Sequence, residues 1–252
     1  MKISAVIITF NEEKNIERCL LSLQDIADEI IVLDSYSTDK TEEICKSYNV
    51  EFYKQKFDGH IQQKNQVISY AKNDFVLSLD ADELISKKLN ASIQGIKKND
   101  LNFDAYFFNR LNIYCGKEIK STSWYPDKKI RLWNKNKGKW GGTNPHDTVT
   151  LDSNTKKQYI KGDLLHYSFS SIDEHIAQTN KFTTISAEHL FQLNKKSSIL
   201  KIIYKTFFAF IKEFILKYAP MSGFYGFIVG GINVFSVFLK YSKLLKLNRE
   251  TK

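Results

Sequence analysis

Cysteine is scarce in this sequence: only Cys19, Cys45 and Cys115 occur among 252 residues. They are far apart, odd in number and never form a CxxC pair, so the sequence predicts neither a disulfide framework nor a zinc site. Free thiols suit a reducing cytoplasm, which is where we expect the protein to act. The first residues, MKISAVIITFNEE, also lack the apolar core of a signal peptide, because acidic residues interrupt them.

Glycine is missing from the places where nucleotide-binding loops need it. The first apolar segment runs into ITFNEEKN, which contains no glycine, and no P-loop motif (GxxxxGKS or GxxxxGKT) occurs. Dinucleotide-binding loops and P-loops both use glycines to bring the backbone against phosphate groups. The sequence therefore excludes these two ways of binding a nucleotide and offers a polar first turn instead.

Acidic residues are scarce at the C-terminal end. Lys and Arg number 26 against 26 Asp and Glu in residues 1–194, and 11 against 2 in residues 195–252. The net charge of +9 therefore belongs entirely to the C-terminal segment. A nucleic-acid-binding protein usually carries its positive charge on a folded face, so we expect no nucleic acid as a partner.

Apolar segments alternate with helical patterns through the first hundred residues. Strands are predicted for KISAVIITF, EIIVLDS, VEFYKQ and FVLSLD, and helices for residues 11–23, 37–48 and 59–72. Apolar strands that alternate with helices indicate a parallel sheet covered on both faces, in an α/β fold. Such sheets bind ligands at the carboxyl ends of their strands, where Asp34 and Asp80 stand.

Three carboxylates follow the fourth strand, in the segment FVLSLDADELI. A solvated strand end before a helix would explain them, since acids suit a helix N-terminus. In an extended strand end, however, Asp80 and Asp82 would point the same way, and two converging carboxylates require a compensating cation. Magnesium or manganese commonly meets that requirement with one or two carboxylates, water and substrate phosphates. We therefore favour a metal site over the solvated strand end.

The motifs together resemble a known family. AVIITFNEEKNIERCLLSL, IIVLDSYSTDKTEEI and QQKNQVISYAKNDFVLSLDADE are similar, in order and spacing, to family 2 glycosyltransferases of the GT-A fold. WYPDKKIRLWNKNKGKWGGTNPHDTV and GDLLHYSFSSIDEHI resemble the branch that includes lipopolysaccharide core glucosyltransferases. The resemblance implies an inverting transferase with a GT-A catalytic domain over residues 1–195. Within it, residues 1–100 would bind the nucleotide and residues 101–195 the acceptor.

The resemblance also implies roles for individual residues. The donor would be a UDP-sugar, with hexose transfer, glucose being the expected sugar, to a lipid-linked acceptor such as lipopolysaccharide core. Nucleotide-sugar binding would fall to Thr9, Asn11, Glu13, Asp34, Lys64 and Asp80, and a divalent metal, Mn²⁺ or Mg²⁺, would be bound by Asp80, Asp82 and His166. Such a cation would neutralise the charge that develops on the departing diphosphate.

A base must take the proton from the acceptor hydroxyl, and the resemblance assigns this role to Asp147 in TNPHDTV. Related sequences often have His-Glu where this chain has His146 and Asp147, so the carboxylate is one methylene shorter. His166 has a plainer explanation than metal binding, as a half-buried imidazole after a strand. Two other functions stay open: a haloacid-dehalogenase-like phosphatase with Asp80 as nucleophile, and a non-catalytic module that binds membrane surfaces.

The C-terminal segment, residues 196–252, predicts two helices. In SSILKIIYKTFFAFIKEFILKYAP, apolar residues recur in steps of three and four while lysines fall on the opposite face, and Pro220 ends the pattern. MSGFYGFIVGGINVFSVFL then runs 19 residues without a charge, long enough to span a bilayer, although glycines and polar residues dilute it. A helical subdomain packed on the sheet or on a second subunit is the alternative. We expect an extension that docks on an anionic membrane, placing the protein peripherally on the inner face of the plasma membrane.

Overall fold

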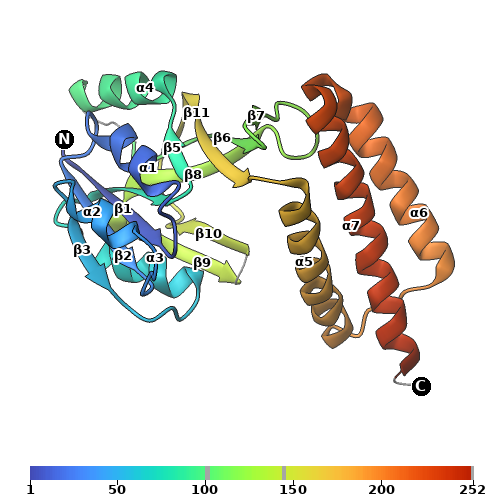
Figure 1. Ribbon diagram of the computed structural model, residues 1–252. Helices are drawn as coiled ribbons and strands as arrows, with labels where there is room; N and C mark the ends of the chain where they lie inside the picture. Colours follow the sequence, from blue (N-terminus) through green and yellow to red (C-terminus); the bar gives the residue numbers. More distant parts are fainter. Residues whose placement is uncertain (100–102, 144–145, 251–252) are drawn as a thin grey trace. The chain divides into compact units, whose positions relative to one another are not determined.

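The computed structural model of the protein describes residues 1–99, 103–143 and 146–250. By internal packing the chain forms two compact units (Figure 1). The first comprises Met1–Arg110 and Asp127–His166, and the second comprises Leu111–Pro126 and Tyr167–Lys252. The functional boundary expected after residue 195 stays a prediction. By packing, helix α5 (Ile172–Gln192) already belongs with the C-terminal helices.

The first unit begins with strands and helices in alternation. They are β1 (Ile3–Thr9), α1 (Ile16–Leu23), β2 (Glu29–Asp34), α2 (Thr41–Lys46), β3 (Glu51–Lys54), α3 (His60–Ser69) and β4 (Phe75–Asp80). The four strands pair in parallel in the order β3-β2-β1-β4. Both faces of β1 are buried, because Ile7 packs in one apolar cluster and Val6 in another. The predicted α/β fold with a largely parallel sheet is confirmed.

The sheet continues beyond β4 with antiparallel strands. The chain adds β5 (Glu83–Ile85), α4 (Lys87–Lys98), β6 (Ala105–Tyr114), β7 (Lys117–Glu118), β8 (Asp127–Asn134) and β11 (Lys157–Phe169). Strands β8, β6, β11 and β5 follow β4 in that order, and β7 pairs with β6. A separate two-stranded sheet consists of β9 (Gly138–Thr143) and β10 (His146–Leu151), which a short 3-10 turn (Lys135–Lys137) precedes.

Helices α1 and α2 are shorter than predicted. Helix α1 begins at Ile16 rather than residue 11, because Asn11 adopts the left-handed φ of 54°. The backbone N–H of Glu12 donates to the hydroxyl of Thr41, at 2.8 Å. Residues 11–15 therefore form a loop that is tied to the start of α2, and this loop stands next to the carboxyl ends of β1 and β2.

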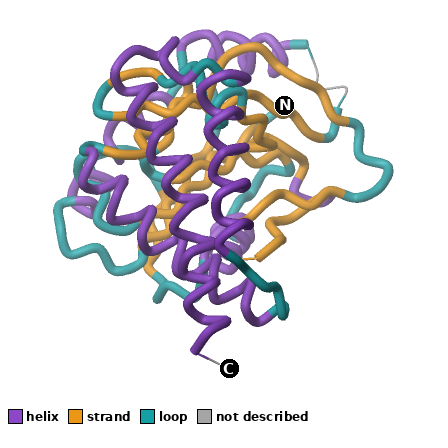
Figure 2. The backbone as a smooth tube through the Cα atoms, turned by 90° about the vertical axis from the view of Figure 1, so that its right-hand side faces the viewer, coloured by secondary structure: helices purple, strands orange, loops and turns teal. Residues whose placement is uncertain are grey.

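The second unit consists mainly of α5, α6 (Ile199–Phe210) and α7 (Gly223–Glu250), with α7 packed against the other two. Figures 1 and 2 show these long helices side by side. A π-helical turn (Ile211–Leu216) and a 3-10 turn (Ala219–Ser222) join α6 to α7. Helical structure thus breaks before Pro220, at Tyr218, whose φ is 47°.

The uncharged segment, from Gly223 onward, forms the first part of the long helix α7. Within the described residues, Ala219–Glu250 is the one helical stretch that is long and apolar enough to cross a membrane by length and composition. Close packing against the preceding turn depends on small residues, because a Cβ at Gly226 would lie 2.2 Å from the carbonyl oxygen of Ala219. A small core of Tyr114, Ile119 and Val229 lies within this unit.

Candidate active site at the carboxyl ends of the parallel strands

Three predicted site residues end neighbouring strands of the parallel sheet. Thr9 pairs in register with Asp34 at the ends of β1 and β2, and Ile8 pairs with Asp80 at the end of β4. The parallel register therefore brings Thr9, Asp34 and Asp80 to one edge of the sheet, where α/β proteins bind their ligands.

The loops that follow β1 and β2 are held in place by hydrogen bonds to the side chains of Asn11, Glu13 and Asp34. The Asn11 side-chain oxygen accepts the backbone N–H of Thr38 at 2.8 Å, and the Glu13 carboxylate accepts that of Lys40 at 3.1 Å. The buried Asp34 carboxylate accepts both the N–H and the hydroxyl of Ser37, at 2.8 and 2.5 Å. These side chains therefore preorganise the edge of the sheet.

Thr9 differs from these three residues. Its hydroxyl is buried and has no hydrogen-bond partner among the described residues. Most buried polar groups are paired, so an unpaired hydroxyl at a strand end is a natural contact for a ligand.

Lys64 joins Asp80 to Asp147. Its ammonium donates to a carboxylate oxygen of Asp80 at 3.1 Å and to one of Asp147 at 2.7 Å. The lysine side chain is only 4% exposed and comes from α3. Three predicted residues that are distant in sequence thus form one ion-paired cluster in the first unit.

The structure adds Glu83 and Arg131, which the sequence analysis did not select. Arg131 donates to the fully buried carboxylate of Glu83 at 2.7 Å and lies 3.4 Å from the Asp80 carboxylate. Burial alone would raise the pKa of Asp80, but Lys64 and Arg131 outweigh it and hold that pKa well below its usual value. Burial would lower the pKa of Arg131, whereas Glu83 and Asp80 raise it above its ordinary value. Asp80 and Arg131 are therefore both charged at neutral pH.

A β-bulge accounts for the position of Arg131. Tyr106 of β6 pairs with Leu132 of β8, and Phe107 pairs with Ile130, so Arg131 is the extra residue. Such bulges redirect a side chain and are common beside active sites. The sequence did carry a signal here, since an arginine inside the apolar run IRLW must find a buried carboxylate.

Asp82 and His166 form a separate pair. The extended strand end that was expected to carry both Asp80 and Asp82 does not form. Strand β4 ends at Asp80, and the chain turns through Asp82 because the Glu83 carboxylate accepts the backbone N–H of Asp80 at 3.1 Å. The Asp82 carboxylate lies 3.1 Å from Nε2 of His166.

Of the three predicted metal ligands, Asp82 and His166 contact each other, and Asp80 is ion-paired with Lys64. No group of three or more His, Cys, Asp and Glu side chains in the described parts of the chain is arranged to hold a metal ion. Asp82 and His166 remain as an oxygen and a nitrogen that face each other at the turn.

The hairpin of β9 and β10 carries Asp147 to the cluster. The side chain of Asn65, on α3, clamps Trp140 by accepting its backbone N–H at 3.0 Å and donating to its carbonyl at 2.9 Å. The indole N–H of Trp140 donates to Ser78 of β4 at 3.2 Å, and the Lys64 ammonium lies 4.4 Å from the indole ring. Asp147 is therefore held by the anchoring of Trp140. The side chain of His146 lies outside what the structure describes.

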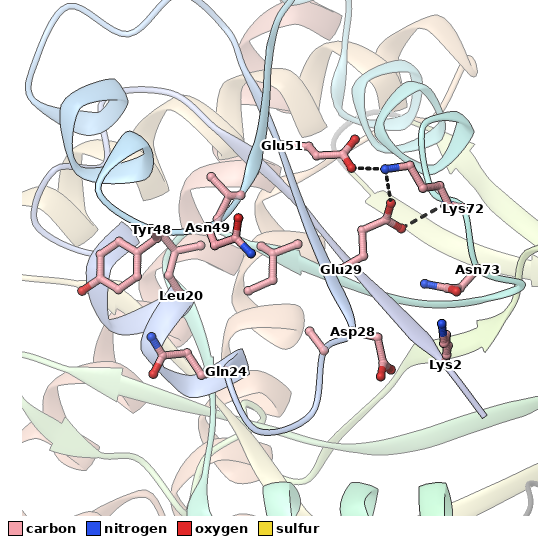
Figure 3. Close-up of a pocket in the computed structure, with 13 residues that line it drawn as sticks. Lys2, Leu20, Gln24, Asp28, Glu29, Tyr48, Asn49, Glu51, Lys72 and Asn73 are labelled. Carbon is pink, nitrogen blue, oxygen red and sulfur yellow. Dashed lines mark hydrogen bonds and ion pairs between the residues drawn. The ribbon is translucent and has the colours of Figure 1, made fainter.

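A cavity of about 400 Å³ opens over the Lys64 cluster. Its lining includes Lys64, Asp80, Arg131, Trp140 and Asp147. A second cavity, of about 550 Å³, lies at the opposite ends of the parallel strands and is shown in Figure 3. There Lys72 is ion-paired with Glu29 at 3.3 Å and with Glu51, and no predicted site residue is present.

The chain is similar to known proteins over most of its length. Residues 4–151 match the sequence profile described as Glycosyl transferase family 2. An uncharacterized glycosyltransferase of Rickettsia typhi is 33% identical over 261 residues, covering 100% of this chain and 89% of the relative. The lipopolysaccharide core biosynthesis glycosyltransferase LpsC of Rhizobium meliloti is 24% identical over 250 residues, covering 97% and 92% of the two chains.

A solved structure of residues 1–349 of S. aureus TarS in complex with UDP aligns with a TM-score of 0.46 and 16% identity, covering 100% of this chain and 92% of that one. The matched segment 4–151 contains every predicted site residue except His166.

Proposed function

The chain belongs to glycosyl transferase family 2, and from this premise we propose that it moves a hexose, with glucose the expected sugar, from a UDP-sugar to a lipid-linked saccharide such as a lipopolysaccharide core. The observation that carries the proposal is the Lys64 cluster. It places a carboxylate that can accept a proton, Asp147, next to cations that can neutralise a diphosphate, all over one cavity. Because the chain belongs to this family, we set aside the hypothesis of a phosphatase with Asp80 as its nucleophile.

The donor nucleotide is proposed to lie across the ends of β1 and β2. The unpaired Thr9 hydroxyl and the loops braced by Asn11 and Glu13 line that edge. The Asp34 carboxylate can accept a further hydrogen bond from the ribose or base in addition to those from Ser37, since each carboxylate oxygen has two lone pairs. The sugar–diphosphate end would then reach Asp80 at the end of β4.

Two residues fit a divalent cation, Mn²⁺ or Mg²⁺. Asp82 and His166 offer an oxygen and a ring nitrogen 3.1 Å apart, and sites for such cations are commonly completed by water and substrate phosphates. When bound there, the cation would supply Lewis-acid neutralisation of the diphosphate. Asp80 is the proposed third ligand on the other side of the turn.

Transfer is proposed to occur in one displacement with inversion. The acceptor hydroxyl oxygen forms a bond to the anomeric carbon while the bond from that carbon to the diphosphate oxygen breaks. The proton passes from the hydroxyl to Asp147, and the electron pair of the broken bond leaves with UDP. Lys64 and Arg131 would stabilise the negative charge that appears on the leaving group.

The lipid-linked acceptor is proposed to reach the protein at an anionic membrane surface. The apolar face of α6 is turned to solvent rather than packed, with Leu200, Ile203 and Phe207 exposed by 77, 60 and 59%. The turn after α6 also exposes Met221, by 80%. Exposed apolar area next to a positively charged segment is typical of helices that lie in the membrane interface.

Donor hydrolysis tests the catalytic proposal. The purified protein is incubated with Mn²⁺ and a panel of nucleotide-sugars, and the free nucleotide is measured. We expect UDP release from a UDP-hexose and loss of this release on adding a chelator. A folded protein that neither binds UDP nor releases nucleotide from any member of the panel would overturn the proposal.

Liposome sedimentation tests the membrane proposal. The full chain should sediment with anionic vesicles, less strongly at high salt, and carbonate should release it, as expected for a docked rather than a spanning protein. The substitutions Leu200→Ser, Ile203→Ser and Phe207→Ser together should weaken binding, whereas Leu21→Ser, which alters an exposed leucine of α1, should not. Point substitutions are preferable to deletion, because α7 contributes Val229 to the core of its unit. Equal binding by the triple variant and the unaltered chain would contradict the proposal.

A further inference from the structure

The wall of the 400 Å³ cavity formed by the start of β8 and by β6 is rich in cations. Arg110, Lys128, Lys129 and Arg131 all line it. Arg131 belongs to the Lys64 cluster through Asp80 and Glu83. The other three, Arg110, Lys128 and Lys129, are called the cationic rim below, and neither the leaving-group chemistry nor the base requires them.

The rim has more positive charge than its carboxylates neutralise. Asp127 is shared between Arg110 at 2.9 Å and Lys129 at 3.1 Å, and Arg110 lies a further 3.8 Å from Glu83, which Arg131 already pairs. Lys128 is exposed and has no ion pair among the described residues. Three cations thus stand against one carboxylate of their own, Asp127, and Lys128 is the cation left over.

Aromatic rings support Lys128. Its ammonium lies 6.0 Å from the ring of Phe107 and 5.8 Å from that of Tyr159, and the two rings are 5.6 Å apart. These are long, weak cation–π contacts, which leave the ammonium donors available for a ligand.

Buried donors of Arg131 point to an anion as well. The residue is only 3% exposed, yet Nε and Nη1 of its guanidinium have no hydrogen-bond partner within the described residues. Buried guanidinium donors without partners are costly, and a phosphate or carboxylate group satisfies such donors well.

The order of strands separates the rim from the proposed nucleotide site. In the order β3-β2-β1-β4-β8-β6, the nucleotide lies at β1 and β2, Asp80 ends β4, and the rim lies beyond it on β8 and β6. With the diphosphate ending at Asp80, as proposed, the acceptor would approach over β8 and β6, on the side of Asp147.

Resting on the proposed function, we propose that the acceptor saccharide carries an anionic group, a phosphate or a carboxylate, that the cationic rim binds while the reacting hydroxyl faces Asp147. Lys128 supplies the unpaired charge, and Arg110 and Lys129 share the anion with Asp127. The rim would thereby determine which acceptor is used.

Calorimetric titration tests this inference. The full chain is saturated with UDP and Mn²⁺, so that the diphosphate site is filled, and is titrated with glucose 6-phosphate, glucuronate and glucose. We expect at least one anionic sugar to bind about 10-fold more tightly than glucose, and the stronger of the two identifies phosphate or carboxylate as the group. Lys128→Glu should abolish this preference. Lys139→Glu, which alters an exposed lysine of β9 outside the cavity, should retain it.

Three results would overturn the inference. They are equal affinity for glucose and both anions, no binding of either anion up to about 10 mM, and equal loss in the Lys128 and Lys139 variants. Donor hydrolysis by the unaltered protein distinguishes this failure from failure of the proposed function. If the protein hydrolyses the donor but shows no preference for an anionic sugar, only the proposed role of the rim is wrong. If it neither binds UDP nor hydrolyses the donor, the transferase proposal itself is wrong.

Discussion

Lys64 places one ammonium group 2.7 Å from the carboxylate of Asp147 and 3.1 Å from that of Asp80. A diphosphate that binds beside Asp80 would compete with Asp147 for this ammonium group, because a phosphate is also a strong acceptor for a cationic donor. We infer that donor binding and the position of Asp147 are coupled through Lys64.

Lys64→Met should weaken UDP binding and transfer together. The substitution removes the cation shared by the two carboxylates and leaves Asp80 with Arg131 as its cationic partner. We expect turnover to fall by about 100-fold or more and UDP affinity to fall measurably in a binding assay. Lys64→Arg should restore part of the affinity, since its guanidinium also binds phosphate. Unchanged UDP affinity in Lys64→Met would contradict the coupling.

Asp147→Asn separates proton transfer from donor binding. The amide keeps the shape of the side chain but cannot accept the proton, so the turnover rate should fall by a factor of about 100 to 10,000. Donor affinity, measured by titration with UDP, should change little. If the variant instead loses donor affinity and keeps its turnover rate, Asp147 contacts the nucleotide and the base is another residue.

Asp82→Asn should abolish metal-dependent UDP binding while the protein stays folded. The carboxylate is the proposed direct ligand, and losing its charge weakens both metal binding and stabilisation of the leaving group. Titration of UDP with and without Mn²⁺ measures the effect. Asp152→Asn, in an exposed turn, serves as the control and should behave like the unaltered chain. Retained Mn²⁺-dependent binding in Asp82→Asn would remove this residue from the metal site.

The buried imidazole of His175 should make the second unit less stable at acidic pH. The imidazole is 4% exposed and packs between Phe169 and Trp124, and burial lowers its pKa from 6.5 to about 4. The unfolded chain therefore binds a proton between these values while the folded chain does not, so stability is full above pH 6.5 and falls towards pH 4. The free energy of unfolding should fall by about 3 kcal/mol as the pH approaches 4.

Thermal unfolding at pH 7.5 and pH 5 measures this dependence. His175→Phe removes the titrating group and keeps the ring stacking, so the difference between the two pH values should shrink even if the variant is less stable overall. An undiminished difference would assign the acid sensitivity to other groups.

Gly162→Ala should destabilise the first unit by about 2–4 kcal/mol. Gly162 has a φ of +115°, and a Cβ there would lie 2.4 Å from the backbone nitrogen of Leu89. Gly95→Ala is the matched control, because a Cβ at this position in α4 meets nothing within 4 Å. It should stabilise the protein by up to about 1 kcal/mol. Urea unfolding followed by circular dichroism distinguishes the two, and equal midpoints would contradict the close contact.

The sequence predicts the parallel half of the fold well, because both signals it uses are local. Apolar strands such as residues 75–80 are bounded by polar turns, and α1 buries Ile16, Cys19, Leu20 and Leu23, which the helical period places on one face. The sequence predicts too early a start for α1. The hydrogen bond from Glu12 to Thr41, which holds this segment in a loop, joins residues that are far apart in sequence.

Contacts between residues that are far apart in sequence also explain why the site could be predicted only in part. Asp80 and Asp147 could be selected by motif, but the cation between them could not be derived from spacing. Glu83 was visible as one of three acids, yet its role depends on Arg131, which a bulge in a distant strand delivers. Arg131 and Glu83 are 48 residues apart and Lys64 and Asp147 are 83 apart, and tertiary packing, which no local pattern encodes, decides such pairings.

The hairpin of β9 and β10 forms a sheet of its own, and Asn65 and Ser78 fasten it to the rest of the first unit through Trp140. The proposed base therefore lies on a small separate sheet, whereas the residues that would hold the donor belong to the main sheet and to the helices and loops next to it. A change in how Asn65 and Ser78 hold Trp140 would therefore move the proposed base relative to the acceptor without altering the residues that would hold the donor.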